Sequence, residues 1–238
     1  MGEWKKVKLG DCIEEVVEKT TENNQHQVLS VTKDGIFSQE EFFKKQIASE
    51  NNIGYKVIRK NNLVFSTMNL WMGSLDVLTN YDIGIVSPAY KIFKFNEELM
   101  LPSYGNYFMK SYYMLEQYKK CSEQGASVVR RNLDLKALLD IKINIPTIVE
   151  QKVIVKTLEN VDGIIEYAKR DIKIYEEFKK SIFKKYYTKL NSSNSYTSKL
   201  EDICTFLKGN GLSKGDLSDN GKECILYGEL YTKYKQKT

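Results

Sequence analysis

The sequence predicts an α+β protein in which one mixed α/β domain is followed by a long helix of a coiled coil. Two observations support this prediction. Short runs of β-branched and aromatic residues, typical of strands, are concentrated in residues 1–147. A heptad pattern of apolar residues then runs through residues 148–190 without a proline. A polar stretch follows, so we expect a third part at residues 191–238, made of a linker and a short further segment.

The composition excludes several classes of protein. Of the 238 residues, 42% are hydrophobic and 28% are charged, which is typical of a globular chain rather than a disordered one. No run approaches the roughly 18 uncharged apolar residues of a membrane span, and the N-terminus lacks the apolar stretch of a signal peptide. The four cysteines are far apart and there is one histidine, which argues against disulfides, zinc sites and catalytic triads. We therefore expect a cytoplasmic protein. Its net charge of +5 does not by itself establish nucleic-acid binding.

The first part of the chain contains two segments that are predicted to be strands and two that are predicted to be helices. Residues 62–67 and 81–95 are rich in β-branched and aromatic side chains. Residues 103–120 carry aromatic and apolar side chains at helical spacing, so we predict a single helix there. Residues 133–139 are predicted to form a short helix that is capped by Asn132.

The heptad pattern predicts one helix that is about 60 Å long, because about 40 residues each add 1.5 Å. An amphipathic helix on a globular core is the alternative, but such helices seldom run past about 25 residues. A sustained apolar seam instead favours a helix packed along another helix. We expect the interface to be formed by Ile154, Leu158, Val161, Ile165, Ile172 and Ile182.

Two polar segments are candidates for a DNA-binding face. Their hydroxyl, amide and guanidinium groups are of the types that donate to phosphates or read base edges. The alternative is a pair of polar surface loops over a core tryptophan, and the residues alone leave both interpretations open. The candidate contacts are Ser66, Thr67, Asn69, Trp71, Ser127, Arg130, Arg131 and Asn132.

No catalytic or metal site is predicted. Asp140, Glu150 and Lys152 match the loose spacing of metal-dependent nucleases, whose carboxylates and lysine lie on adjoining strands. Here Glu150 follows Pro146 and begins the long helix, where a carboxylate stabilises the positive end of the helix dipole. We therefore interpret Glu150 as a structural residue and the chain as non-catalytic. Mg²⁺-dependent cleavage of DNA by the isolated chain would contradict this interpretation.

A short repeat links the two ends of the chain. The sequence Lys-Leu-Glu-Asp-Ile-Cys at residues 199–204 resembles Lys-Leu-Gly-Asp-Cys-Ile at residues 8–13. Because the second copy comes directly after the predicted helix and linker, we interpret it as the start of a second repeat of the domain.

The segment at residues 145–162 resembles the start of the conserved spacer helix in the specificity subunits of type I restriction-modification systems. The blocks at residues 66–73 and 84–90 resemble one common subtype of the target recognition domain of that family, and residues 224–234 are similar to the opening of a second such domain. The helix pattern is proline, three residues, Glu-Gln and then apolar heptads. This chain meets it with Pro146, Glu150, Gln151, Ile154, Leu158 and Asp162.

The resemblance implies a DNA-binding subunit without catalytic residues. In the family, each target recognition domain reads one half of a bipartite DNA sequence, and two antiparallel helices hold the two domains apart. Two methyltransferase (modification) subunits and ATP-driven restriction motor subunits join this core. S-adenosylmethionine, ATP and Mg²⁺ are therefore expected in the partner subunits, and no cofactor is expected in this chain.

The chain departs from the family pattern because the second recognition domain ends soon after it starts. The resemblance thus predicts a half-subunit, with a target recognition domain at residues 1–147 and the spacer helix at residues 148–190. We expect two copies to pair as a homodimer through antiparallel helices and to read an interrupted palindrome. The competing prediction is a coiled-coil module that recruits other proteins without reading DNA itself.

Overall fold

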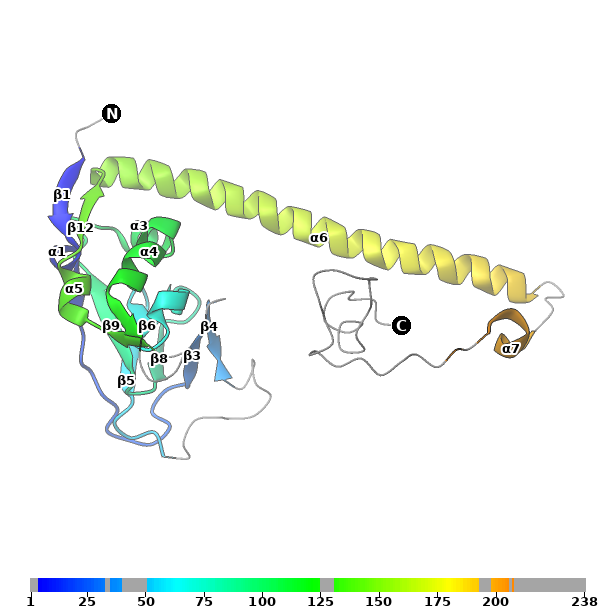
Figure 1. Ribbon diagram of the computed structural model, residues 1–238, viewed down its shortest axis with the longest axis horizontal. Coiled ribbons are helices and arrows are strands. Elements are labelled where there is room, and N and C mark those ends of the chain that lie inside the picture. The colour runs from blue at the N-terminus through cyan, green and yellow to red at the C-terminus, as the bar shows by residue number, and fades with distance from the viewer. Residues whose placement is uncertain are drawn as a thin grey trace. The chain divides into compact units, whose positions relative to one another are not determined.

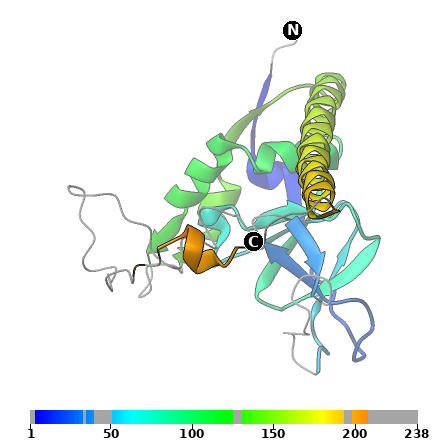
Figure 2. The same ribbon diagram turned by 90° about the vertical axis from the view of Figure 1, so that its right-hand side faces the viewer.

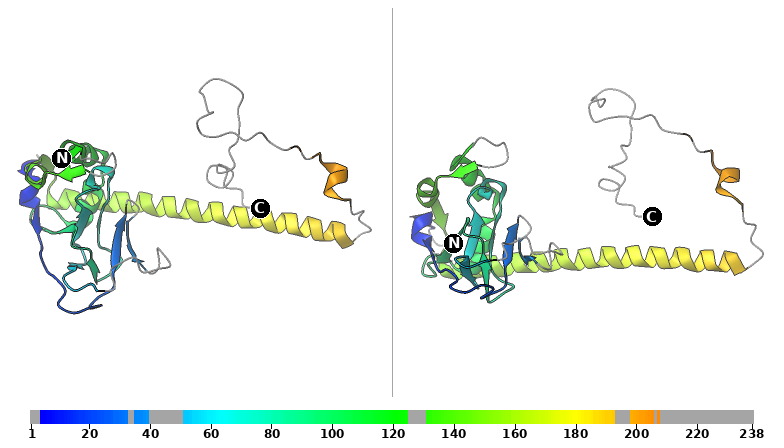
Figure 3. Two further views of the ribbon diagram at one scale, coloured as in Figure 1. Left: turned by 60° about the horizontal axis from the view of Figure 1, so that its bottom comes forward. Right: turned by 90° about the horizontal axis from the view of Figure 1, so that it is seen from below.

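The computed structural model describes residues 4–32, 35–39, 51–124, 131–192, 198–205 and 207. The chain divides into two compact units, residues 1–171 and 172–238. The first unit holds a mixed α/β domain and the first part of α6 (Ile148–Ser192), a helix of 45 residues (Figures 1, 2 and 3). The predicted fold class and the predicted long helix are therefore confirmed, while the first 24 residues of that helix belong to the same unit as the domain.

A four-stranded antiparallel sheet forms the centre of the domain. Its strands, in spatial order, are β2 (Ile13–Glu15), β9 (Tyr90–Phe95), β6 (Leu63–Ser66) and β7 (Leu75–Val77). The strands at 62–67 and 81–95 that the sequence predicts are thus confirmed, and the second segment contains both β8 (Ile83–Val86) and β9.

Among the described residues, four further antiparallel pairs lie outside this sheet. They join β1 (Lys5–Lys8) to β12 (Lys142–Ile145), β3 (Leu29–Thr32) to β4 (Gly35–Ser38), β5 (Lys56–Arg59) to β8, and β10 (Ser122–Gln124) to β11 (Arg131–Leu133). The short helices in the part of the chain that the structure describes are α1 (Leu9–Cys12), η1 (Leu70–Met72), α3 (Pro102–Met109), α4 (Tyr112–Lys120), α5 (Leu135–Leu139) and α7 (Leu200–Ile203).

Both faces of the central sheet are buried, each in its own cluster of apolar side chains. Because successive residues of a strand point to opposite faces, Phe65 and Phe93 lie on one face while Val64 and Ile92 lie on the other. The rings of Phe65 and Phe93 stack with their centroids 5.4 Å apart, in the cluster that α3, α4, α5 and the start of α6 also enter. Val64 and Ile92 pack with residues of β3, β4, β5 and β8. The domain is therefore a sheet between a helical layer and a layer of strand pairs.

The prediction of one helix over residues 103–120 is wrong, because the segment forms two helices. α3 ends at Met109, and Ser111 caps α4 by accepting a hydrogen bond on Oγ from the backbone N–H of Met114 at 3.3 Å. A serine that bonds its own backbone in this way starts a new helix, although the apolar spacing continues across the break.

The predicted cap of the following short helix is also wrong. Asp134 caps α5, since its Oδ1 accepts from the N–H of Ala137 at 2.9 Å. Asn132 instead lies in β11, opposite Glu123 of β10. The helix itself, Leu135–Leu139, is close to the predicted range.

The repeated hexapeptide adopts the same turn in both copies. Lys8 N–H donates to Asp11 Oδ2 at 3.0 Å, and Lys199 N–H donates to Asp202 Oδ2 at 3.1 Å. The packing differs, because Leu9 of α1 is fully buried whereas Leu200 of α7 is exposed. The local sequence therefore suffices for the turn. The block at residues 224–234 lies outside the described residues.

Gly105 provides a test of the helical layer. A Cβ at this position of α3 would lie 2.4 Å from Cε1 of Phe95, whose ring is buried. We expect Gly105→Ala to lower the free energy of unfolding by about 1–3 kcal/mol, as overpacked cores do. Urea titration followed by circular dichroism would measure it. Gly163→Ala is the matched control, because that Cβ would meet no atom within 4 Å and the helix should gain stability. Equal changes in both variants would contradict this account.

Candidate nucleic-acid interface

The loop between β6 and β7 is the first of the two polar segments. Backbone hydrogen bonds close it: Ser66 N–H donates to Ser74 O at 3.2 Å, and Met72 N–H donates to Asn69 O at 3.0 Å. Gly73 ends the turn with a φ of 83°, a conformation that favours glycine. Leu70 is buried in the core in the middle of this loop. The loop is therefore held to the domain on both its backbone and its side chains.

The second polar segment reaches this loop through the hairpin of β10 and β11. Arg131 N–H donates to the carbonyl of Met68 at 3.3 Å. The guanidinium carbon of Arg131 lies 4.3 Å from the centroid of the Trp71 ring, within the range of a cation–π contact. Two of the residues that the sequence analysis assigned to a DNA-binding face are thus brought together from segments 60 positions apart.

The remaining candidates are placed as follows. Ser66 is 8% exposed, so its side chain is almost fully buried. Thr67 and Asn69 are half-buried on the loop, and Asn132 is exposed on β11. Ser127 and Arg130 lie outside the described residues.

The Arg131 side chain contacts Trp71, but one of its hydrogen-bond donors has no partner in the part of the chain that the structure describes. Among the described residues, its buried Nε has no hydrogen-bond partner. An unpaired buried donor costs about 1–3 kcal/mol, so a hydrogen-bond acceptor at this position would be favourable. A guanidinium group that lies over an indole ring is restricted in position, and its planar set of N–H donors suits a planar acceptor pair such as O6 and N7 of guanine.

Two of the three residues with nuclease-like spacing, Asp140 and Glu150, have structural roles. Lys8 Nζ donates to Asp140 Oδ1 at 2.7 Å, and this hydrogen bond lowers the pKa of the carboxyl group. Glu150 and Thr147 form a capping box, in which Thr147 N–H donates to Glu150 Oε2 at 3.1 Å. The interpretation of Glu150 as a structural residue in the first turn is confirmed. Among the residues that the structure describes, no group of three His, Cys, Asp or Glu side chains is arranged to hold a metal ion.

Gln151 connects the domain to the long helix. It is fully buried and makes three hydrogen bonds: Nε2 donates to Leu99 O at 2.7 Å and to Pro146 O at 3.0 Å, while Oε1 accepts from Leu101 N–H at 2.9 Å. Sequence reasoning found Gln151 as part of a motif but missed this role. The available signal was that Gln151 is an uncharged polar residue within a segment of apolar heptads.

The apolar stripe of α6 is exposed over most of its length. Ile154 is half-buried against the domain core and Leu158 is half-buried too, so the exposed stripe begins at Val161. Ile165, Ile172 and Ile182 are between 40% and 60% exposed, values that are unusual for isoleucine. Every side chain from position 164 to position 189 is exposed. This surface corresponds to the predicted helix interface without its first residues.

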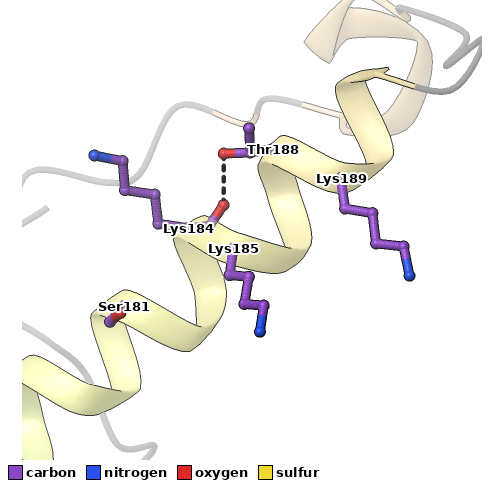
Figure 4. A pocket seen from close by; sticks show the side chains of 5 residues that line it. All are labelled: Ser181, Lys184, Lys185, Thr188 and Lys189. Atoms are coloured by element: carbon purple, nitrogen blue, oxygen red, sulfur yellow. Dashed lines mark hydrogen bonds between the residues drawn. The ribbon is translucent and has the colours of Figure 1, made fainter.

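The last turns of α6 are strongly basic. Residues 178–192 include five lysines and no acidic residue, whereas residues 148–177 include seven acidic and five basic residues. An open hollow of about 550 Å³ lies on this helix. Figure 4 shows the side chains that line it. In it, Thr188 donates to the carbonyl of Lys184 at 2.8 Å and the lysine side chains point in different directions (Figure 4). The hollow is lined by Ser181, Lys184, Lys185, Thr188 and Lys189.

Among the residues that the structure describes, none of the helices is long and apolar enough to cross a membrane.

Comparison with known structures finds the same fold in type I restriction-modification proteins. The HsdS subunit from Thermoanaerobacter tengcongensis matches with a TM-score of 0.53 and 17% identity, over 71% of this chain and 44% of that one. A chain from a structure that describes the complex assembly and conformational transition of the type I R-M system matches with a TM-score of 0.53 and 15% identity, over 90% of this chain and 57% of that one. The chain thus spans about half the length of these two structures.

A comparison with curated proteins found no match. The sequence pattern of the type I restriction modification DNA specificity domain, in contrast, matches residues 1–177. This match covers the whole α/β domain and the first 30 residues of α6. The chain therefore belongs to the family of type I restriction modification DNA specificity domains.

Proposed function

We propose that this chain reads one half of a bipartite DNA sequence and directs the methyltransferase and restriction subunits of a type I restriction-modification complex to it. The observation that carries the proposal is the contact of Arg131 with Trp71, which joins both polar segments on a rigid support. An arginine held in this way suits base recognition better than a free surface lysine does.

In this proposal, contacts on the recognition face divide into two kinds. Arg131 reads a base edge in the major groove, and Thr67, Asn69 and Asn132 add hydrogen bonds to bases or phosphates. Arg130 and Ser127 belong to the same proposed set. The lysines of the last turns of α6 would add attraction to phosphates that is independent of sequence.

The chemistry of the complex belongs to other subunits in this proposal. The chain carries out no methylation and no cleavage, and it acts in the cytoplasm together with methyltransferase subunits and a restriction motor subunit. S-adenosylmethionine, ATP and Mg²⁺ bind to those partners. The structural roles of Asp140 and Glu150 support this division.

We further propose that two copies of the chain pair through α6. Burial of Val161, Ile165 and Ile172 against a second helix would stabilise the pair by about 1.5–3 kcal/mol for each large side chain. The charge distribution favours antiparallel helices, because a parallel pair would bring the two five-lysine ends together. A two-fold pair places identical recognition domains at opposite ends, so its target would be an interrupted palindrome.

A binding selection tests the proposed function. We expect the purified chain to enrich one short sequence from a random duplex library, and to bind it at least about 1000-fold more tightly than a scrambled duplex at 150 mM salt. The chain alone should not modify DNA when S-adenosylmethionine, ATP and Mg²⁺ are added, whereas addition of its methyltransferase should produce methylation at the selected sequence. Binding without any sequence preference would instead support the coiled-coil module that recruits proteins. DNA cleavage by the repurified chain would contradict the non-catalytic role.

A further inference from the structure

The long helix is attached to the domain at two places along one side. Gln151, which is fully buried, holds the first turn through its three hydrogen bonds, and Val155 is buried one turn later. Asp162 then accepts a hydrogen bond from the hydroxyl of Tyr107 at 2.6 Å. Gln151 and Asp162 are 11 residues apart, which is about three turns, or about 16 Å along the axis. Residues 4, 7 and 11 apart lie on the same side of a helix.

Each attachment fixes a different property of the helix. A single buried anchor at Gln151 fixes where α6 starts but leaves its tilt to weaker contacts. A second attachment three turns away fixes the direction of the axis. From position 164 to position 189 every side chain is exposed, so Asp162 lies at the end of the stretch that the domain supports.

Tyr107 is well placed to hold the second attachment. It lies on α3, between the buried residues Tyr104 and Met109, so its own backbone is rigid. Partial burial, together with the hydrogen bond to Asp162, raises the pKa of the Tyr107 hydroxyl to about 12, so the group is a protonated donor at neutral pH. Hydrogen bonds from a neutral donor to a carboxylate are shorter and stronger than those between neutral groups.

A small change of tilt at this point has a large effect at the far end of the helix. From Asp162 to the end of α6 there are 30 residues, or about 45 Å of helix. A tilt of about 5° would displace that end by about 4 Å, which is close to the 3.4 Å rise of one nucleotide along DNA.

We propose that Tyr107 is a positioning residue, whose hydrogen bond to Asp162 fixes the direction of α6 and thereby the number of base pairs between the two half-sites that a pair of recognition domains can occupy. The inference rests on the proposed function for its DNA part. The direction of the helix itself can be measured without DNA.

The first experiment measures the direction of the helix in the free protein. Spin labels at Glu97→Cys on the domain and Arg170→Cys on α6, with Cys204 and Cys224 replaced by serine, give a distance distribution by double electron–electron resonance. Dilution with unlabelled chain restricts the signal to distances within one chain. We expect Tyr107→Phe to broaden this distribution and Asp162→Asn to leave it narrow, because an amide oxygen still accepts from the hydroxyl. Glu166→Gln is the control, since Glu166 is an exposed residue of α6 whose carboxylate pairs with Lys169 of the same helix.

The second experiment measures the spacing preference on DNA. Duplexes carry two copies of the selected half-site, with the gap between them changed by single base pairs, and a further duplex carries one half-site. We expect Tyr107→Phe to reduce the preference for the best gap over its neighbours by about threefold to tenfold, while affinity for the single half-site is unchanged.

Each outcome decides a separate part of the inference. An unchanged distance distribution in Tyr107→Phe would overturn the positioning role. A broadened distribution with an unchanged gap preference would overturn the link to spacing. If the parent chain selects no half-site at all, the proposed function is wrong, whereas the spin-label result still decides whether Tyr107 sets the direction of α6.

Discussion

Replacement of Arg131 by alanine is expected to weaken binding to the selected DNA sequence by about 1–3 kcal/mol, which is about fivefold to 150-fold, and to relax the preference at one base position. The reason is that the guanidinium group lies over the ring of Trp71, while the backbone N–H of Arg131 donates to the carbonyl of Met68, so the side chain is held in position before DNA binds. Arg131→Lys should rescue little, because an ammonium group cannot make the bidentate contact. Titration of matched and single-mismatch duplexes at two salt concentrations would measure both effects.

Two controls separate base reading from a general loss of charge. Arg59→Ala removes the same charge from a site on β5 where the arginine pairs with Glu18, so it should change specific and scrambled binding alike and only slightly. Trp71→Ala should also reduce the preference for the matched duplex. The effects of Trp71→Ala and Arg131→Ala should not add in the double variant, because both substitutions remove the same contact. If Arg131→Ala keeps the full preference for the matched duplex at both salt concentrations, the assignment of Arg131 to a base is wrong.

Replacement of Ile165 and Ile172 by aspartate is expected to abolish pairing of the chain at micromolar concentration. In a two-fold pair each substitution occurs twice, so four large apolar contacts worth about 1.5–3 kcal/mol each are lost. A dimer with a micromolar Kd has an association free energy of about 8 kcal/mol. The lost apolar contacts, together with the cost of burying the new charges, exceed this value. Sedimentation velocity of the parent chain and of the double variant would measure this.

The chain offers a matched control for this prediction. Tyr167 and Ile174 are also exposed and are also seven residues apart, but they lie about 200° around the helix from Ile165 and Ile172. Tyr167→Asp with Ile174→Asp adds the same charges to the opposite side and should leave the dimer intact. Circular dichroism and urea titration should show a folded domain in both double variants. A parent chain that is monomeric throughout the micromolar range would contradict the proposed pair.

The features that the sequence predicted correctly depend on local pattern. The long helix follows from an apolar repeat that continues for about 40 residues. The strands β6 and β9 were predicted from segments that are rich in β-branched and aromatic residues. In each of these strands, alternate side chains pack into the two apolar clusters. The predicted helix boundaries were wrong where a short polar side chain caps a helix by bonding to its backbone. Ser111 divides a continuous helical spacing into α3 and α4, and Asp134 rather than Asn132 begins α5.

The features that the sequence did not provide depend on pairs of distant residues. The residue types of the candidate DNA-binding face were predicted, but the contact of Trp71 with Arg131 requires the hairpin of β10 and β11 to cross the loop after β6. The role of Gln151 depends in the same way on backbone groups of Leu99 and Leu101, some 50 residues away. No local pattern encodes such pairings, since they arise only when the tertiary fold is complete.

The pairing of β1 with β12 has a consequence for the order of events during synthesis. Lys5 lies opposite Ile145, so β1 cannot pair until a strand that is translated 140 residues later has been synthesised. At about 5–20 residues per second, that interval is roughly 7 to 30 s on the ribosome. Closing so long a loop costs about 2 kcal/mol more entropy than closing a ten-residue loop. Because α6 begins only three residues after Ile145, the nascent domain is completed and its helix is anchored at nearly the same moment. Until then β1 has no partner strand, but it is only four residues long and three of them are lysines, which protects the exposed edge from pairing with other chains during synthesis.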